Sequence, residues 1–143
     1  MQPRTVTKRR KIVLVAEDNP TIAWAIGLAL RKAGFSPKLV HDGIDALNMI
    51  MEMKPDALVL DLELPRLQGA EICSLVRKSH LLWDTPIVVI SGHAEVGDRL
   101  QAFDLGADDF VTKPFSVEEM IARVRAVLTR SGLGSSSAFF YQS

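Results

Sequence analysis

The sequence predicts one α/β domain in which five parallel strands alternate with five helices and form an open, doubly wound sheet. The apolar runs are short, continuous and rich in Val, Ile and Leu, as is typical of strands that are covered on both faces. Stretches with the helical spacing of apolar residues separate these runs. The chain has 143 residues, of which 48% are hydrophobic and 24% charged, and this suits a single globular core.

The expected strands are the apolar runs at 12–16, 36–41, 57–61, 87–90 and 110–112. Four of these runs end at side chains that carry chemistry. The polar residues at their ends are, in chain order, Glu17 and Asp18, then Asp61, Ser91 and Lys113.

The expected helices lie between the strands, at 20–33, 43–53, 68–79, 96–105 and from Ser116 to about residue 130. Pro20 stands at a first helical position, and Gly34 follows the end of the same helix. Ser116 and Glu119 form a capping box for the last helix. We therefore expect a domain at 11–130, a flexible basic arm at 1–10 and a flexible tail at 131–143.

The composition argues against several functional classes. Lys plus Arg and Asp plus Glu number 17 each, so zero net charge gives no reason to expect direct binding to nucleic acid or to an acidic membrane. The single cysteine, Cys73, excludes an internal disulfide framework and fits a reducing cytoplasm. No apolar run is long enough to cross a bilayer. We therefore expect a cytoplasmic protein without membrane contact.

The polar strand ends point to a metal site. Parallel strands gather their carboxyl ends at one edge of the sheet, and ligands bind there. Glu17, Asp18 and Asp61 would bring three carboxylates together, and a hard divalent cation would relieve their repulsion. This donor set suits Mg²⁺, with Mn²⁺ as a second possibility. The three histidines share no zinc-ligand spacing.

The same edge carries the groups that phosphoryl transfer needs. Asp61 supplies an attacking oxygen, while the Lys113 ammonium and the Ser91 hydroxyl offset charge on the phosphoryl oxygens. A cis Lys113-Pro114 bond would help to aim the lysine inward. Two other classes use a similar edge. A haloacid-dehalogenase-like Mg²⁺-dependent phosphatase also uses a strand-end aspartate, and a flavin or nucleotide binder would need a phosphate-binding loop in place of the acidic 17–20 segment.

Four motifs stand at the strand ends: Val15-Ala16-Glu17-Asp18-Asn19, Asp61-Leu62-Glu63-Leu64-Pro65 with Gly69, Ser91-Gly92, and Lys113-Pro114-Phe115. Taken together, they resemble the receiver (CheY-like) domain of two-component response regulators. The last third of the chain, at 106–115 and 122–128, is especially like the OmpR/PhoB-type subfamily. The resemblance implies a flavodoxin-like (βα)5 fold with strand order 2-1-3-4-5. It also implies a phosphorylation-activated switch that accepts a phosphoryl group on Asp61 from a histidine kinase or histidine phosphotransfer protein. Such a domain catalyses its own phosphorylation and slow dephosphorylation and is not a turnover enzyme.

The resemblance also assigns roles to individual residues. Asp18, Asp61 and the Glu63 backbone carbonyl would ligate Mg²⁺, and Glu17 would act largely through water. Ser91 and Phe110 take the positions of the switch hydroxyl and the switch aromatic, and Phe110 would turn inward as Ser91 moves toward the phosphoryl group. A phosphate-independent pseudo-receiver adaptor is a further alternative, although no key group is missing here.

Further residues are expected to affect the rate of dephosphorylation and to form a dimer interface. Glu63 and His93 should flank the phosphoryl group and affect how fast water attacks it. The subfamily dimerises through its fourth helix, fifth strand and fifth helix, and the matching charges pair in sign: Arg99 with Glu119, and Asp109 with Arg123. Those relatives carry a DNA-binding domain after the receiver, and we expect none in this chain.

The helix at 20–33 is apolar over nine consecutive residues, which is more than one buried stripe requires. The expected buried stripe is Ile22, Ala25, Ile26, Ala29 and Leu30. Trp24 and Leu28 lie off this stripe, four residues apart. We hypothesise that Trp24 and Leu28, with Ile22 and Pro114, form a docking surface for the phosphoryl donor, or that Trp24 and Leu28 make a second self-contact. Coverage by the arm or the tail is the alternative.

Overall fold

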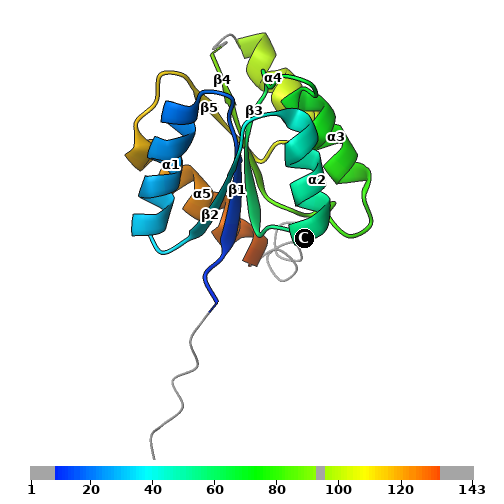
Figure 1. Cartoon of the computed structure of the whole chain (residues 1–143). Helices are drawn as coiled ribbons and strands as arrows, with labels where there is room; N and C mark the ends of the chain where they lie inside the picture. The colour runs from blue at the N-terminus through cyan, green and yellow to red at the C-terminus, as the bar shows by residue number, and fades with distance from the viewer. Residues whose placement is uncertain (1–8, 93–95, 133–143) are drawn as a thin grey trace, which may run out of the picture.

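Five parallel strands form one sheet with helices on both faces (Figure 1). The computed structural model describes residues 9–92 and 96–132, and only the backbone at 96–99 and 131–132. The strand order is β2-β1-β3-β4-β5, which confirms the predicted order 2-1-3-4-5. The elements are β1 Ile12–Ala16, α1 Pro20–Lys32, β2 Ser36–Val40, α2 Gly43–Met53, β3 Ala57–Asp61, α3 Gly69–Lys78, β4 Ile87–Ser91, α4 Val96–Asp104, β5 Asp109–Thr112 and α5 Val117–Gly132.

The sheet divides the core into two layers, because successive strand residues point to opposite faces. On β3, Leu58 and Leu60 pack toward α2 and α3, whereas Val59 packs toward α1 and α5. Figure 1 shows α1 and α5 on one side of the sheet, with α2 and α3 on the other. All five residues of β3 are buried. Continuous apolar strands therefore arise because both faces are covered, as the sequence predicted.

The buried face of α1 differs from the expected stripe. The buried residues are Ala23, Ile26, Gly27 and Leu30, while Ala25 and Ala29 are only partly buried. The prediction was wrong at these positions because a helix without polar residues offers no contrast from which to locate its inner face. Although the buried face of α1 differs from the expected one, Trp24 is still 62% exposed and Leu28 37% exposed.

The described residues begin at Arg9, inside the expected arm, and end at Gly132. The helix α5 continues to Gly132, two residues into the expected tail. The rest of that tail and residues 1–8 of the expected arm lie outside the described residues. Among the residues that are described, no helix has the length and apolar character needed to cross a membrane.

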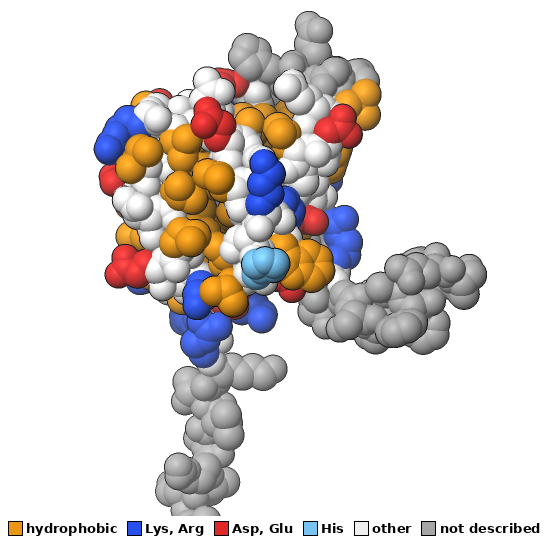
Figure 2. Space-filling model, turned by 90° about the vertical axis from the view of Figure 1, so that its right-hand side faces the viewer, with side chains coloured by type: hydrophobic (Ala, Val, Ile, Leu, Met, Phe, Trp, Pro, Cys, Tyr) orange, Lys and Arg blue, Asp and Glu red, His pale blue; other side chains and the backbone are white. Residues whose placement is uncertain are grey.

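The side of the molecule built from α2 and α3 exposes apolar side chains (Figure 2). Met51 on α2 and Leu75 on α3 are about half exposed. In the loop after α3, Leu81 and Trp83 are also exposed. This side is separate from the exposed Trp24 and Leu28 on α1, because the sheet lies between the two helix layers (Figure 1).

Gly69 allows the start of α3 to lie directly against the end of β3. A Cβ atom at this position would lie 2.3 Å from the Asp61 carbonyl oxygen and 2.8 Å from Cα of Leu62. The Gly69 amide also donates to the Leu62 carbonyl at 3.1 Å. Backbone atoms supply these contacts, so a larger residue cannot be accommodated by a side-chain rotation alone.

We therefore predict that Gly69→Ala lowers the free energy of unfolding by about 1–3 kcal/mol, because the β3–α3 connection must shift. Urea unfolding monitored by circular dichroism measures this change. Gly92→Ala is the matched control, since a Cβ there meets nothing within 4 Å, and its effect should stay within about 0.5 kcal/mol. Equal stability of Gly69→Ala and the wild type would contradict the packing argument.

Candidate functional site

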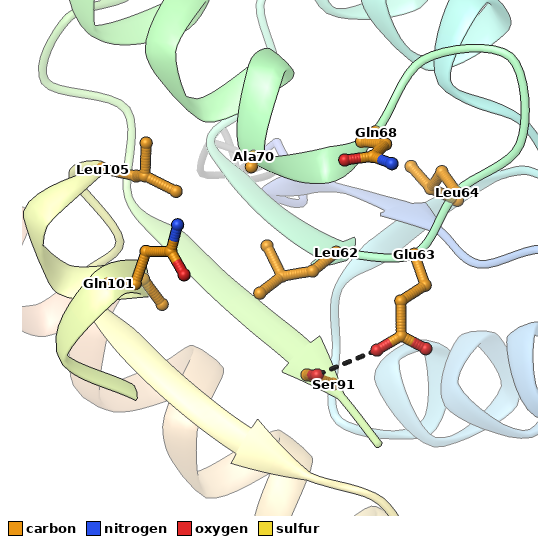
Figure 3. A pocket seen from close by; sticks show the side chains of 9 residues that line it. Leu62, Glu63, Leu64, Gln68, Ala70, Ser91, Gln101 and Leu105 are labelled. Carbon is orange, nitrogen blue, oxygen red and sulfur yellow. Dashed lines mark hydrogen bonds between the residues drawn. The ribbon is translucent and has the colours of Figure 1, made fainter. Parts of the chain in front are cut away.

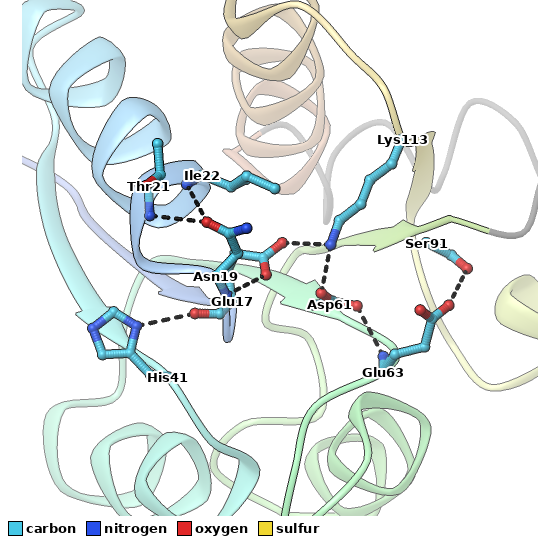
Figure 4. A network of polar contacts seen from close by, with 9 residues as sticks. All are labelled: Glu17, Asn19, Thr21, Ile22, His41, Asp61, Glu63, Ser91 and Lys113. Atoms are coloured by element: carbon cyan, nitrogen blue, oxygen red, sulfur yellow. Dashed lines mark hydrogen bonds and ion pairs between the residues drawn. The ribbon is translucent and has the colours of Figure 1, made fainter.

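Three strand ends meet around the ammonium group of Lys113 at the carboxyl edge of the sheet (Figure 4). Nζ of Lys113 lies 2.8 Å from Oδ2 of Asp61 and 2.8 Å from Oε1 of Glu17. Glu17 follows β1, Asp61 ends β3 and Lys113 follows β5. The structure thus brings together groups that are up to 96 residues apart in sequence, at the edge where the strand ends placed them.

Both oxygens of the Asp61 carboxylate are held in place. Oδ2 accepts from Nζ of Lys113, and Oδ1 accepts from the Glu63 backbone amide at 2.9 Å. The Asp61 side chain is 1% exposed, so these bonds replace the water that it would otherwise bind. The expected cis Lys113–Pro114 bond is also present. The Asp61 carboxylate is therefore held in one orientation.

Burial and charge act in opposite directions on Lys113. Burial by itself lowers the pKa of Lys113, but the contacts with Asp61 and Glu17 outweigh it, so the pKa of Lys113 is raised above its ordinary value. The lysine therefore remains a cation at neutral pH. It supplies a fixed positive charge beside Asp61.

Glu17 is a buried carboxylate whose charge is incompletely compensated. Oε2 accepts from the Asn19 backbone amide at 2.9 Å. Oε1 forms an ion pair with Nζ of Lys113 at 2.8 Å, and it accepts no hydrogen bond from the other described residues. Burial, aided by the nearby Asp61 charge, raises the pKa of Glu17 to about 7.

The three carboxylates fit a hard divalent cation. One oxygen each from Glu17, Asp18 and Asp61 lie within 4.8 Å of one another. Asp18 is exposed, and it therefore faces the solvent side of the cluster. A buried carboxylate oxygen such as Oε1 of Glu17 is a ligand of the kind that Mg²⁺ favours. The residues present therefore fit the predicted metal.

Two residues near the cluster had received no individual role from the sequence. Asn19 caps α1 by accepting from the amides of Thr21 and Ile22, and its own amide holds Glu17. Nδ1 of His41 lies 3.0 Å from the Glu17 carbonyl oxygen. An asparagine directly before a helix-starting proline signals a cap. No comparable sequence signal marks His41, because its contact depends on the neighbouring strand.

Ser91 and Glu63 form a second pair at the site (Figures 3 and 4). The Ser91 hydroxyl donates to Oε1 of Glu63 at 3.0 Å. Ser91 is 2% exposed at the end of β4, while the Glu63 side chain is exposed. Both residues line a hollow of about 370 Å³ between α3 and α4, together with Leu62, Leu64, Gln68, Ala70, Gln101, Ala102 and Leu105. The hydroxyl therefore lies at the boundary between the site and this hollow.

The expected switch and dimer residues occupy defined positions. The Phe110 side chain is 5% exposed and packs in the α2–α3 layer of the core. Arg123 contacts Asp109 at 3.3 Å and Glu119 at 3.6 Å within the same chain. The Arg99 side chain and all of His93 lie outside the described residues. The inward turn of Phe110 and the interchain pairs remain predictions.

The expected docking residues line two neighbouring hollows on the α1 side. Ile22 and Pro114 line a hollow of about 440 Å³, together with Thr21, Ala25, Ile26, Lys113, Phe115 and Val117. Trp24 and Leu28 line a second hollow of about 620 Å³ between α1 and α5. The first hollow includes Lys113 and so adjoins the carboxylate cluster.

Comparison with known proteins identifies similar chains. The family described as Response regulator receiver domain matches residues 13–125. Response regulator MprA of Mycobacterium avium is 42% identical over 119 residues, which are 83% of this chain and 51% of MprA. This chain therefore spans about half the length of the curated relatives that it matches.

Solved structures share the fold. A putative response regulator from Chloroflexus aurantiacus J-10-fl has a TM-score of 0.81 at 32% identity, covering 85% of this chain and 100% of that one. The receiver domain of sensor histidine kinase PA1611 from Pseudomonas aeruginosa PAO1 has a TM-score of 0.77 at 29% identity, covering 85% of this chain and 99% of its own. That structure has a magnesium ion coordinated in its active-site cleft.

The Glu17 carboxyl predicts a pH dependence of stability in the metal-free protein. Its pKa is about 7 in the folded chain and 4.5 for an unperturbed glutamate, so the folded state binds the proton more tightly than the unfolded state. The free energy of unfolding should therefore fall as pH rises from about 4.5 through 7. We expect this group to lower the free energy of unfolding at pH 8 by on the order of 3 kcal/mol.

Glu17→Gln should remove most of that loss, and urea unfolding at pH 5 and pH 8 in a chelator measures it. Glu52→Gln makes the same chemical change at an exposed position on α2 and should leave the pH dependence unaltered. The same loss in Glu17→Gln as in the wild type would show that another group causes it.

Proposed function

The chain belongs to the response regulator receiver domain family, and from this premise we propose that Asp61 is its phosphorylation site. Members of this family act as phosphoacceptors in two-component signalling rather than as turnover enzymes. The observation that carries the proposal is the Lys113 ammonium, 2.8 Å from both Asp61 and Glu17 at the sheet edge. It places one fixed cation beside an oriented, buried carboxylate.

The proposed reaction transfers a phosphoryl group from a phosphohistidine. An oxygen of Asp61 forms the new bond to phosphorus while the bond from phosphorus to the histidine nitrogen breaks. Lys113 remains protonated and faces Asp61, so it offsets negative charge on the phosphoryl oxygens. Glu17, Asp18, Asp61 and the Glu63 carbonyl would hold Mg²⁺ or Mn²⁺, which when bound supplies further positive charge. Water later attacks the same phosphorus atom, the bond from phosphorus to the Asp61 oxygen breaks, and phosphate leaves while the Asp61 carboxylate is restored.

The donor is proposed to dock on the α1 side of the molecule. Ile22 and Pro114 line a hollow that also includes Lys113, so a protein bound there lies beside the reacting group. Trp24 is 62% exposed and lines the adjoining hollow with Leu28. Exposed apolar side chains next to a concave surface are typical of a protein interface. A histidine kinase or a histidine phosphotransfer protein is the proposed partner.

A homodimer through α4, β5 and α5 is the proposed output of phosphorylation. On α4, Leu100 is 60% exposed and Phe103 is 46% exposed. Asp109 and Arg123 pair within one chain in this structure, so the interchain pairs would have to replace existing ones. Exposed ion pairs contribute little individually, and the apolar residues of α4 therefore carry more of the proposed interface.

We predict that acetyl phosphate with Mg²⁺ adds one phosphate to the wild-type chain. Intact-mass spectrometry should detect an addition that is absent from Asp61→Asn, because the amide oxygen is a poor nucleophile. Size-exclusion chromatography before and after the reaction reports the dimer. Multiple turnover of a small phosphate ester would instead favour a phosphatase, and an unmodified wild-type chain would contradict the proposal.

A second prediction tests the docking surface. Trp24→Ala should slow phosphotransfer from a phosphorylated histidine kinase or phosphotransfer protein by about tenfold, since a buried tryptophan at an interface is worth more than 1 kcal/mol. Its reaction with acetyl phosphate should be unchanged. Trp83→Ala removes a tryptophan of similar exposure, 60%, from the loop after α3 and serves as control. Equal rates for both variants would exclude Trp24 from the interface.

A further inference from the structure

The hydroxyl of Ser91 is already engaged in this structure, and its acceptor is a carboxylate. The hydrogen bond from Ser91 Oγ to Glu63 Oε1 is 3.0 Å long and joins the end of β4 to the loop after β3 (Figure 4). A hydrogen bond to an ionised acceptor is stronger than one between neutral groups. The bond therefore holds the hydroxyl in one orientation.

A serine hydroxyl carries one proton and can donate to one acceptor at a time. Ser91 is 2% exposed, so an acceptor on the protein or on a bound group, rather than bulk water, decides where that proton points. In phosphoryl transfer at Asp61, the same proton would be needed by a phosphoryl oxygen. The Glu63 carboxylate and the phosphoryl group are therefore competitors for a single donor.

We propose that Glu63 is a positioning residue that holds the Ser91 hydroxyl away from Asp61 until a phosphoryl group displaces it. This inference rests on the proposed function of Asp61 as phosphoacceptor. It extends that function by identifying what opposes the switch. The free energy of the Glu63–Ser91 hydrogen bond opposes the transfer of the hydroxyl to a phosphoryl oxygen.

The position of Glu63 suits this role. Its backbone amide donates to Oδ1 of Asp61 at 2.9 Å, so the residue is fixed beside the phosphoacceptor. Its side chain is exposed and lines the hollow of about 370 Å³ beside Ser91 (Figure 3). Once released, the carboxylate can therefore be hydrated without disturbing the core. The Ser91 hydroxyl, in contrast, exchanges the Glu63 carboxylate for a phosphoryl oxygen as its acceptor.

Beryllofluoride, which mimics a phosphoryl group on aspartate, tests the competition without turnover. Its apparent affinity in Mg²⁺ is measured by ¹⁹F nuclear magnetic resonance for the wild type, Glu63→Ala, Ser91→Ala and the double variant. We expect Glu63→Ala to bind beryllofluoride about fivefold more tightly than the charge change alone accounts for, as one hydrogen bond is worth about 1 kcal/mol. The Ser91→Ala background isolates that charge effect, because no hydroxyl is left to compete for.

Glu63→Gln separates charge from hydrogen bonding further, since its amide oxygen still accepts from Ser91. Its affinity should fall between those of the wild type and Glu63→Ala. An equal effect of Glu63→Ala with and without the Ser91 hydroxyl would overturn the inference while leaving Asp61 as phosphoacceptor. Failure of the folded wild type to bind beryllofluoride in Mg²⁺ would instead overturn the proposed function, and this inference with it.

Discussion

The contact of one ammonium group with two buried carboxylates is the constraint on which this site depends. Glu17 and Asp61 are almost completely buried, and Lys113 lies 2.8 Å from each. Two buried anions without a cation would repel each other and lose their hydration. Lys113 compensates one of them well, through the hydrogen bond to Asp61, and the other incompletely, as the raised pKa of Glu17 indicates. The remaining electrostatic strain favours a second cation at the same edge.

The parallel sheet makes this convergence possible. The registers pair Ala16 with Leu60, Asp61 with Ile90 and Ser91 with Thr112. Strands that are neighbours in the sheet therefore end within about a residue of one another. A side chain placed after any of these strands must therefore emerge at the same edge. Gly69 contributes by letting α3 begin against the Asp61 backbone, where a Cβ would lie 2.3 Å from the carbonyl oxygen. Chemistry and packing consequently constrain the same few residues after β3.

The components of the site differ in how firmly they are held. Asp61 is held by two hydrogen bonds and Lys113 by two carboxylates, whereas the exposed Glu63 side chain contacts Ser91 from the solvent side. The elements around this centre expose apolar side chains that include Trp24 and Leu28 on α1 and Leu100 and Phe103 on α4. The proposed phosphoryl group on Asp61 would therefore meet a fixed cation and a hydroxyl whose present acceptor is an exposed side chain.

The sequence by itself determined the element order, the doubly wound sheet and the placement of Glu17, Asp18, Asp61, Ser91 and Lys113 at one edge. Continuous apolar runs and the polar residues at their ends carry that information locally, because the parallel sheet brings the ends of all its strands to one edge. The inner face of α1, the Ser91–Glu63 bond and the Asp109–Arg123 pair within one chain were decided only by the tertiary structure. So was the Arg77 side chain, which binds three carbonyls and Asp108 across separate segments. These features depend on distances of a few ångströms between elements, and no residue pattern along a single segment encodes such distances.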